Sequence, residues 1–232
     1  MSADCSDIPA LLAAATSSGH GLSALAPASC AHALGLDSIT LCLLNKSGLE
    51  LVWYDPSHTT AVAFEDLEFT LGEGPTQDAV RTGEPVLVPD LHAVPEERWP
   101  ALLAAARPGP PRAVHAVPLH LGATQLGALT GHRATPGPLT RPQMSQLLAL
   151  AEGAVTILTT PEGIHDMRAD QPLSLHRAVV HQATGALAVR LGVPVDQALI
   201  RLRAYAFTHN RPLHDVAHDV VHHYATLDMP SC

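Results

Sequence analysis

The feature that most constrains the fold is a change of pattern near residue 160. Before it, short strand-like runs alternate with helical segments. After the segment "PEGIHDMRADQP" no strand-like run remains, and a Pro-containing polar stretch of this kind is typical of a linker. The sequence therefore predicts one domain over residues 1–159, a linker over 160–172, a second domain over 173–226 and a tail over 227–232.

The first part has the pattern of an α+β domain. Helical material over about 9–34, interrupted near Gly19–Gly21, precedes the runs "SITLCLL" and "LELVWY", which "NKSG" separates as in a hairpin. Later strand-like runs are "EPVLVPDL", "AVHAVPLHL" and "TQLGALTGHR", and further helices are expected at about 60–68, from the end of "TLGEGPTQDAV", at 96–106 and at 140–158, the closing helix. This order predicts an antiparallel sheet flanked by helices.

The second part predicts a small bundle of three helices, roughly 173–191, 194–209 and 212–225. Gly192 stands where a C-terminal cap belongs. The middle helix has two apolar faces, one with Leu199 and Leu202 and the other with Ile200 and Phe207. Either it lies between two neighbours or it offers the Phe207 face to a partner.

A glycine inside the first of these helices needs an explanation. In "HQATGALAVRLGVP", Gly185 costs about 1 kcal/mol relative to alanine. Two explanations are open. Either helices pack tightly against it within the bundle, or a polyanion backbone approaches it from outside the chain. On a helical wheel Arg177, His181 and Thr184 share one face, which we expect to be exposed and able to meet phosphate or base edges.

The charge of the chain argues against a generic polyanion binder. There are 13 basic and 22 acidic residues, for a formal net charge of −9, and Lys46 is the only lysine. From Leu173 onward the chain has five arginines and four aspartates, so the acidic excess belongs to the first part. Seven of the fifteen histidines lie in that same helical part.

No motif indicates an enzyme or a metal site. The four cysteines form no CxxC pair, and neither GxSxG nor HExxH is present. His214, His218 and His222 recur at i, i+4 and i+8, which allows a metal pair, a polar RNA-facing or pH-sensitive surface, or a plain solvated face. We expect no metal, no catalytic residue and no cofactor, although a small-molecule ligand in the first domain stays open.

Other features of the first part have local explanations. "LGEGP" is expected to be a tight loop, with a bound anion at the following helix as the alternative. Asp78 and Asp90 are interpreted as caps or turn residues, and the aromatic residues as core or pocket lining. No signal peptide or membrane span is visible in the sequence, so we expect a cytoplasmic protein.

The helical part resembles an ANTAR domain, the RNA-binding output module of bacterial transcription antiterminators. The resemblance runs over about fifty residues, "VVHQATGALAVRLGVPVDQALIRLRAYAFTHNRPLHDVAHDVV". The matching positions are Gln182, Ala183, Gly185, Leu187, Ala198, Leu202, Arg203, Ala206, Asn210, Leu213, Val216 and Ala217. Many ANTAR domains have a lysine where this chain has Thr184, which implies a weaker electrostatic contribution.

The first part is similar to a GAF domain, a regulatory sensor fold. "TLGEGPTQDAVRTGEPVLVPDL", "ERWPALLAAA" and "AVPLHLGATQLGALTGHR" carry that similarity, which spans most of residues 9–158. Proteins that join GAF to ANTAR are known among actinobacteria. The two resemblances cover nearly the whole chain.

Together the resemblances imply a signal-responsive regulator that binds paired hairpins in nascent mRNA and prevents termination. They imply a homodimer, paired through the closing helix, with RNA as the partner and neither DNA nor a membrane. The candidate RNA-binding residues are Arg177, His181, Gln182, Thr184, Arg203, Asn210 and Arg211. The alternative is a dimeric sensor whose helical tail binds a protein; the acidic chain and the Phe207 face favour it.

Overall fold

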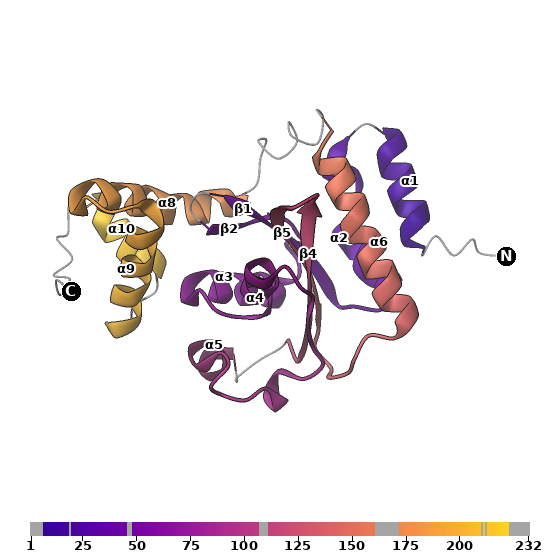
Figure 1. The fold of residues 1–232 in the computed structure, drawn as a ribbon, viewed down its shortest axis with the longest axis horizontal. Helices are drawn as coiled ribbons and strands as arrows, with labels where there is room; N and C mark the ends of the chain where they lie inside the picture. The colour runs from indigo at the N-terminus through magenta and orange to yellow at the C-terminus, as the bar shows by residue number, and fades with distance from the viewer. Residues whose placement is uncertain are drawn as a thin grey trace. The chain divides into compact units, whose positions relative to one another are not determined.

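The computed structural model describes residues 7–18, 20–45, 48–106, 111–160, 172–209, 211 and 213–222. These residues form two compact units. The first is drawn from residues 1–43 and 51–170, and the second from 44–50 and 171–232. Figure 1 shows the elements of both units.

The first unit is built on one five-stranded sheet with the strand order β2-β1-β5-β4-β3. The pairs β1–β5, β5–β4 and β4–β3 are antiparallel. The elements in chain order are α1 (Ile8–Ser18), η1 (Gly21–Ala24), α2 (Pro27–Leu34), β1 (Ser38–Asn45), β2 (Gly48–Trp53), α3 (Thr59–Leu71), α4 (Pro75–Thr82), β3 (Val86–Val88), η2 (Leu91–Ala93), α5 (Pro100–Ala106), β4 (Ala113–Leu121), β5 (Thr124–Arg133) and α6 (Arg141–Leu158). The predicted α+β fold with an antiparallel sheet and flanking helices is confirmed.

Helices cover both faces of this sheet. α1, α2 and α6 lie on one face, and α3, α4 and α5 lie on the other (Figure 1). Because successive strand residues point to opposite faces, the odd-numbered Ile39 and Leu41 of β1 join the apolar core under α6, while Thr40 and Cys42 face α3. A second apolar core, around Trp99 just before α5, fills part of the α3 side.

The closing helix α6 is fixed at its start by a capping box. The backbone N–H of Gln143 donates to Thr140 Oγ1, and the backbone N–H of Thr140 donates to Gln143 Oε1 at 2.9 Å. Gln143 Nε2 also donates to the backbone oxygen of Leu34, at 2.8 Å. This contact ties the start of α6 to the end of α2.

The second unit contains the helices α8 (Pro172–Leu191), α9 (Val195–Thr208) and α10 (Leu213–His222), each in contact with the other two. Their buried apolar residues are Val180, Ala183, Leu187, Ala198, Leu199, Leu202, Ala206, Leu213, Val216, Ala217 and Val220. Gly192 ends α8 at φ +63°, as expected of a cap. The predicted continuation of the third helix to residue 225 lies outside the described residues.

The middle helix α9 buries only one of its two apolar faces. Leu199 and Leu202 are buried, whereas Ile200 is 62% exposed and Phe207 67% exposed. Within the described residues, α9 therefore does not lie between two neighbours, and its Phe207 face is exposed. Separately, no helix of the described chain combines the length and the apolar character that crossing a bilayer requires.

Two glycines of β5 should differ in their tolerance of a side chain. A Cβ at Gly127 would collide with the backbone oxygen of Cys42, whereas a Cβ at Gly131 would meet the flexible end of Leu36, 2.5 Å from its Cδ1. We expect Gly127→Ala to cost about 3 kcal/mol or more and Gly131→Ala about 1 kcal/mol. Urea unfolding followed by tryptophan fluorescence measures both, and equal costs would contradict this packing.

Candidate functional site

The structure describes six of the seven candidate RNA-binding residues. Gln182 and Arg211 are exposed, His181 and Arg203 are partly buried, and Arg177 and Thr184 are buried. Asn210 lies outside the described residues. The candidates therefore do not form a single exposed face.

The prediction that Arg177 and Thr184 lie on an exposed face is wrong. Thr184 is 0% exposed, and its hydroxyl donates to the backbone oxygen of Val180 at 2.6 Å. Arg177 is 2% exposed and donates from Nη1 to the backbone oxygen of Leu49, which belongs to the same unit, at 3.2 Å. The Thr184 hydroxyl bonds its own helix backbone, so a polar residue can occupy the buried stripe of α8.

Three of the candidates have acidic or cationic neighbours within the second unit: His181, Arg203 and Arg211. His181 Nε2 lies 2.7 Å from Glu50 Oε2, and Arg211 Nη2 lies 2.7 Å from Asp219 Oδ2. The hydrogen bond to Asp219 raises the pKa of Arg211. Burial, followed by the positive charge of Arg177, lowers the pKa of Arg203 to about 10. A phosphate that approaches Arg211 would compete with an existing carboxylate.

Gly185 is open to its surroundings. A Cβ placed on it would meet no atom within 4 Å apart from its own helix backbone. Among the described residues, the explanation by tight packing within the bundle is therefore wrong, because no other described helix has an atom within 4 Å of this Cβ position. Gln182 and Val189, which share its helix face, are exposed, Val189 at 85%. An approach from outside the chain is the explanation that remains.

The histidine stripe on α10 shows no arrangement for metal binding. The rings of His218 and His222 have their centroids 4.3 Å apart, and His214 Nδ1 lies 3.7 Å from Asp215. In the part of the chain that the structure describes, no group of three or more His, Cys, Asp or Glu residues is placed to hold a metal ion.

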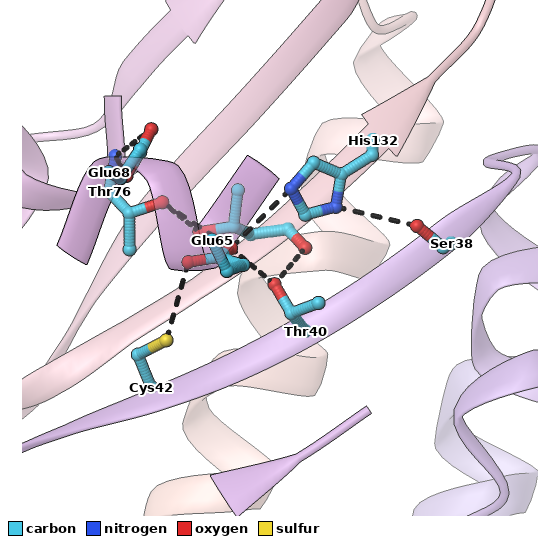
Figure 2. Close-up of polar contacts among 8 residues, drawn as sticks. Ser38, Thr40, Cys42, Glu65, Glu68, Thr76 and His132 are labelled. Carbon is cyan, nitrogen blue, oxygen red and sulfur yellow. Dashed lines mark hydrogen bonds and ion pairs between the residues drawn. The ribbon is translucent and has the colours of Figure 1, made fainter. Parts of the chain in front are cut away.

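A buried polar cluster lies between α3 and the sheet in the first unit, and the sequence analysis did not identify it. Figure 2 shows polar side chains from four elements pointing toward one another. Glu65 and Glu68 come from α3 and are at most 2% exposed. The other members are Ser38, Thr40 and Cys42 of β1, Thr76 of α4, and Thr130 and His132 of β5.

Glu65 is the centre of this cluster. Its Oε1 accepts hydrogen bonds from the hydroxyls of Thr40, at 2.6 Å, and Thr76, at 3.5 Å. Its Oε2 accepts from the Cys42 thiol at 3.4 Å. His132 Nε2 lies 3.4 Å from Glu65 Oε1, and Ser38 Oγ lies 3.5 Å from the other ring nitrogen. The arrangement supplies a carboxylate with neutral donors and one group that can become cationic.

Glu68 occupies the start of α4. Its two carboxylate oxygens lie 3.0 and 3.3 Å from the backbone nitrogen of Thr76, which donates to them. A Cβ at Gly74, where φ is +137°, would collide with this carboxyl group, so the glycine makes room for it. The loop "LGEGP" is thus a tight loop, and the protein's own Glu68 side chain occupies the start of the following helix.

The ionisation of Glu68 is coupled to that of Glu65. Burial, followed by the charge of Glu65, raises the pKa of Glu68 well above the ordinary value, although the hydrogen bonds from Thr76 and Gln77 lower it. Charges this close in a buried site oppose each other's ionisation.

The remaining candidates of the first unit have structural roles. Asp90 caps η2 through His92 and forms a double hydrogen bond with Arg112, and Asp78 accepts from Trp99 Nε1 at 3.1 Å. The aromatic residues Trp53, Phe64, Phe69 and Trp99 are buried. The signal that identifies the cluster is alternation: even-numbered positions of β1 carry Ser, Thr and Cys, and odd ones Ile and Leu.

The two units are an antiparallel five-stranded sheet flanked by helices and a bundle of three helices. The GAF domain model matches residues 23–158, and the ANTAR domain model matches residues 175–221. The chain therefore belongs to the GAF family and carries an ANTAR domain after it, the organisation of a GAF–ANTAR regulator. No curated protein matches the chain.

Solved structures of other proteins are similar to part of this chain. The GAF domain of a phosphoenolpyruvate-protein phosphotransferase from Acinetobacter has a TM-score of 0.50 at 14% identity, covering 71% of this chain and 95% of its own. The corresponding domain from Coxiella burnetii has a TM-score of 0.49 at 16% identity, covering 67% and 95%. A free methionine-R-sulfoxide reductase from Neisseria meningitidis has a TM-score of 0.47 at 16% identity, covering 70% and 89%.

The Thr40 hydroxyl should contribute to stability through Glu65. Thr40→Val keeps the shape of the side chain and removes the donor at 2.6 Å, so a buried carboxylate loses a hydrogen bond. We expect a cost of about 1–3 kcal/mol in denaturant unfolding. Thr156→Val, at an exposed position of α6 whose hydroxyl bonds Glu152, is the matched control and should change stability by about 0.5 kcal/mol or less. Equal effects would show that Glu65 does not depend on this donor.

Proposed function

We propose that this chain binds hairpin RNA in nascent transcripts through its ANTAR domain and prevents termination, with the GAF domain as the regulatory input. We infer that it acts as a homodimer and as a regulator rather than an enzyme, with RNA rather than DNA or a membrane as partner. We assign no cofactor, and the input of the GAF domain is unidentified. The match to an ANTAR domain model supports the proposal at the level of the family.

The observation that carries the proposal is the bare surface at Gly185. A glycine within a helix destabilises it by about 1 kcal/mol relative to alanine, and no described residue occupies the space that a Cβ would take. A residue that costs stability without helping the fold is explained by a contact that forms on binding. The exposed amide of Gln182 on the same face supplies donors and an acceptor suited to base edges.

Cationic and amide groups of the same domain support RNA as the occupant. Arg203 and Arg211 provide charge, and Gln182 and Asn210 provide amides for unpaired bases. Arg177 and Thr184 are buried and act through the packing of α8 instead. With so few cations, most of the affinity on this proposal comes from close contact with splayed loop bases rather than from a phosphate background.

Gly185→Ala separates stability from binding. We expect the variant to unfold at higher denaturant, by up to about 1 kcal/mol, because alanine favours the helix and meets no neighbour. We expect its affinity for a tandem-hairpin RNA to fall by about tenfold or more, because a methyl group keeps the RNA from the helix. The measurements are urea unfolding and fluorescence anisotropy across a salt series.

The controls for this experiment lie on α8 and α9. Gln182→Ala should also weaken RNA binding without a gain in stability, whereas Ile200→Ala, on the exposed face of α9, should leave RNA binding unchanged. A Gly185→Ala variant that is more stable and binds RNA as tightly as the parent would exclude this face as the RNA site.

The exposed face of α9 favours a second candidate function, in which the helical domain binds a protein. Ile200, Ala204 and Phe207 are exposed together on one side of that helix. If a protein is the partner, Phe207→Ala will abolish its capture and RNA affinity at low salt will be weak and independent of Gly185. Tight RNA binding that weakens steeply with salt and persists in Phe207→Ala would favour RNA.

A further inference from the structure

Two aromatic rings are stacked on each other at the end of α9. Tyr205 and His209 lie one turn apart, and their ring centroids are 3.9 Å apart at an interplanar angle of 18°. His209 directly follows the last residue of the helix, and its side chain leans back over the preceding turn. The ring pair of α10 is different, because His218 and His222 are tilted by 39° and form no parallel stack.

Hydrogen bonds hold the His209 ring in place before any ligand binds. Its Nδ1 lies 2.9 Å from the backbone oxygen of Tyr205 and 3.1 Å from Thr208 Oγ1. A carbonyl oxygen can only accept, so Nδ1 carries the hydrogen. The backbone N–H of His209 donates to the same oxygen at 3.1 Å. A ring that is fixed in this way loses little conformational freedom when a ligand stacks on it.

The pair presents a ring face to solvent. Tyr205 is half-buried, whereas His209 is exposed. One face of the His209 ring lies against Tyr205, so the opposite face is the one that a planar ligand can reach. A ring placed on it would continue the parallel stack, which is a favourable arrangement for aromatic groups.

The surroundings of the pair suit a base better than a phosphate. The C-terminal end of a helix carries a partial negative charge. The backbone N–H of Arg211 closes this end by donating to the Ala206 oxygen at 2.9 Å, and its guanidinium is bound to Asp219 at 2.7 Å. Arg211 therefore fixes the turn after α9 rather than offering a free cation. Stacking of a base on an aromatic side chain needs no such cation.

We propose that the exposed face of the His209 ring is a stacking site for one unpaired base of an RNA loop, with Tyr205 as its support. Every base has a π face, so the contact is tolerant of sequence. The inference rests on the proposed function, because it names the part of the RNA that the helical domain holds. It adds a contact on α9 to the one proposed at Gly185 of α8. His209 is not among the residues that the sequence analysis selected.

Two substitutions separate stacking from a capping role of His209. His209→Asn keeps an amide donor for the Tyr205 oxygen and loses the ring, whereas His209→Phe keeps a ring and loses the donor. We expect His209→Asn to weaken binding of a tandem-hairpin RNA by about fivefold or more and His209→Phe to bind within about twofold of the parent. If His209 is only a cap, His209→Phe will unfold at lower urea concentration and His209→Asn will bind RNA as the parent does.

The matched control makes the same change on α10. His222 is exposed and belongs to the tilted pair, so His222→Asn should leave the RNA affinity unchanged. Equal losses in His209→Asn and His222→Asn would show that the histidines act without a stacking site at residue 209. Fluorescence anisotropy measures the affinities, and urea unfolding shows that each variant is folded.

A spectroscopic test uses the parent chain and reports stacking directly. Tandem-hairpin RNAs are prepared with 2-aminopurine at one loop position at a time, since the fluorescence of this base falls when it stacks. At one position at least, the parent and His209→Phe should quench the signal and His209→Asn should not. Binding without any quenching that depends on residue 209 would reject the stacking site and leave the proposed function standing. A parent chain that binds no hairpin RNA at low salt would reject both.

Discussion

Glu65 packs against the sheet where β1 and β5 carry small polar side chains. The arrangement of the α3 side of the first unit depends on this contact. Thr40 and Thr130 leave a volume that large apolar residues would fill elsewhere, and the carboxylate of Glu65 enters it. Glu68, one turn further along α3, reaches the start of α4. The apolar core of this layer is displaced toward Trp99 and α5. Polar contacts thus join four elements in the interior, where an unsatisfied group is costly.

The sequence predicts much of this fold because local signals agree with the tertiary structure. β4 and β5 begin and end at the predicted residues, since Gly122 provides the turn and alternation marks both strands. α6 begins at its capping box. Where local signals are weaker, the observed boundaries differ from the predicted ones. The helix α3 continues to Leu71, and β3 contains only three residues between flanking prolines.

The polar cluster is different because its members lie far apart in the chain. Residues 38 and 132 meet only through the β1–β5 pairing, and a sequence pattern does not specify which strands become neighbours. The run "SITLCLL" is strand-like as a whole. Its small polar face indicates a buried polar cluster only when it is known that a helix with two glutamates covers it. Helical periodicity has a similar limit in α8. It identifies the stripes, but Thr184 and Arg177 show that polarity does not decide which stripe is buried.

The helical unit combines few cations with a position that its own packing leaves bare. Arg211 is bound to Asp219, and Arg203 is partly buried beside the charge of Arg177. A surface of this kind gains little from long-range attraction of a polyanion. On the function proposed here, its selectivity comes from contact distance, because a helix without a side chain at residue 185 admits a ligand backbone or a base where any larger residue would exclude it. Such a surface selects ligands that can come close to the helix, as the splayed and unpaired bases of an RNA loop can.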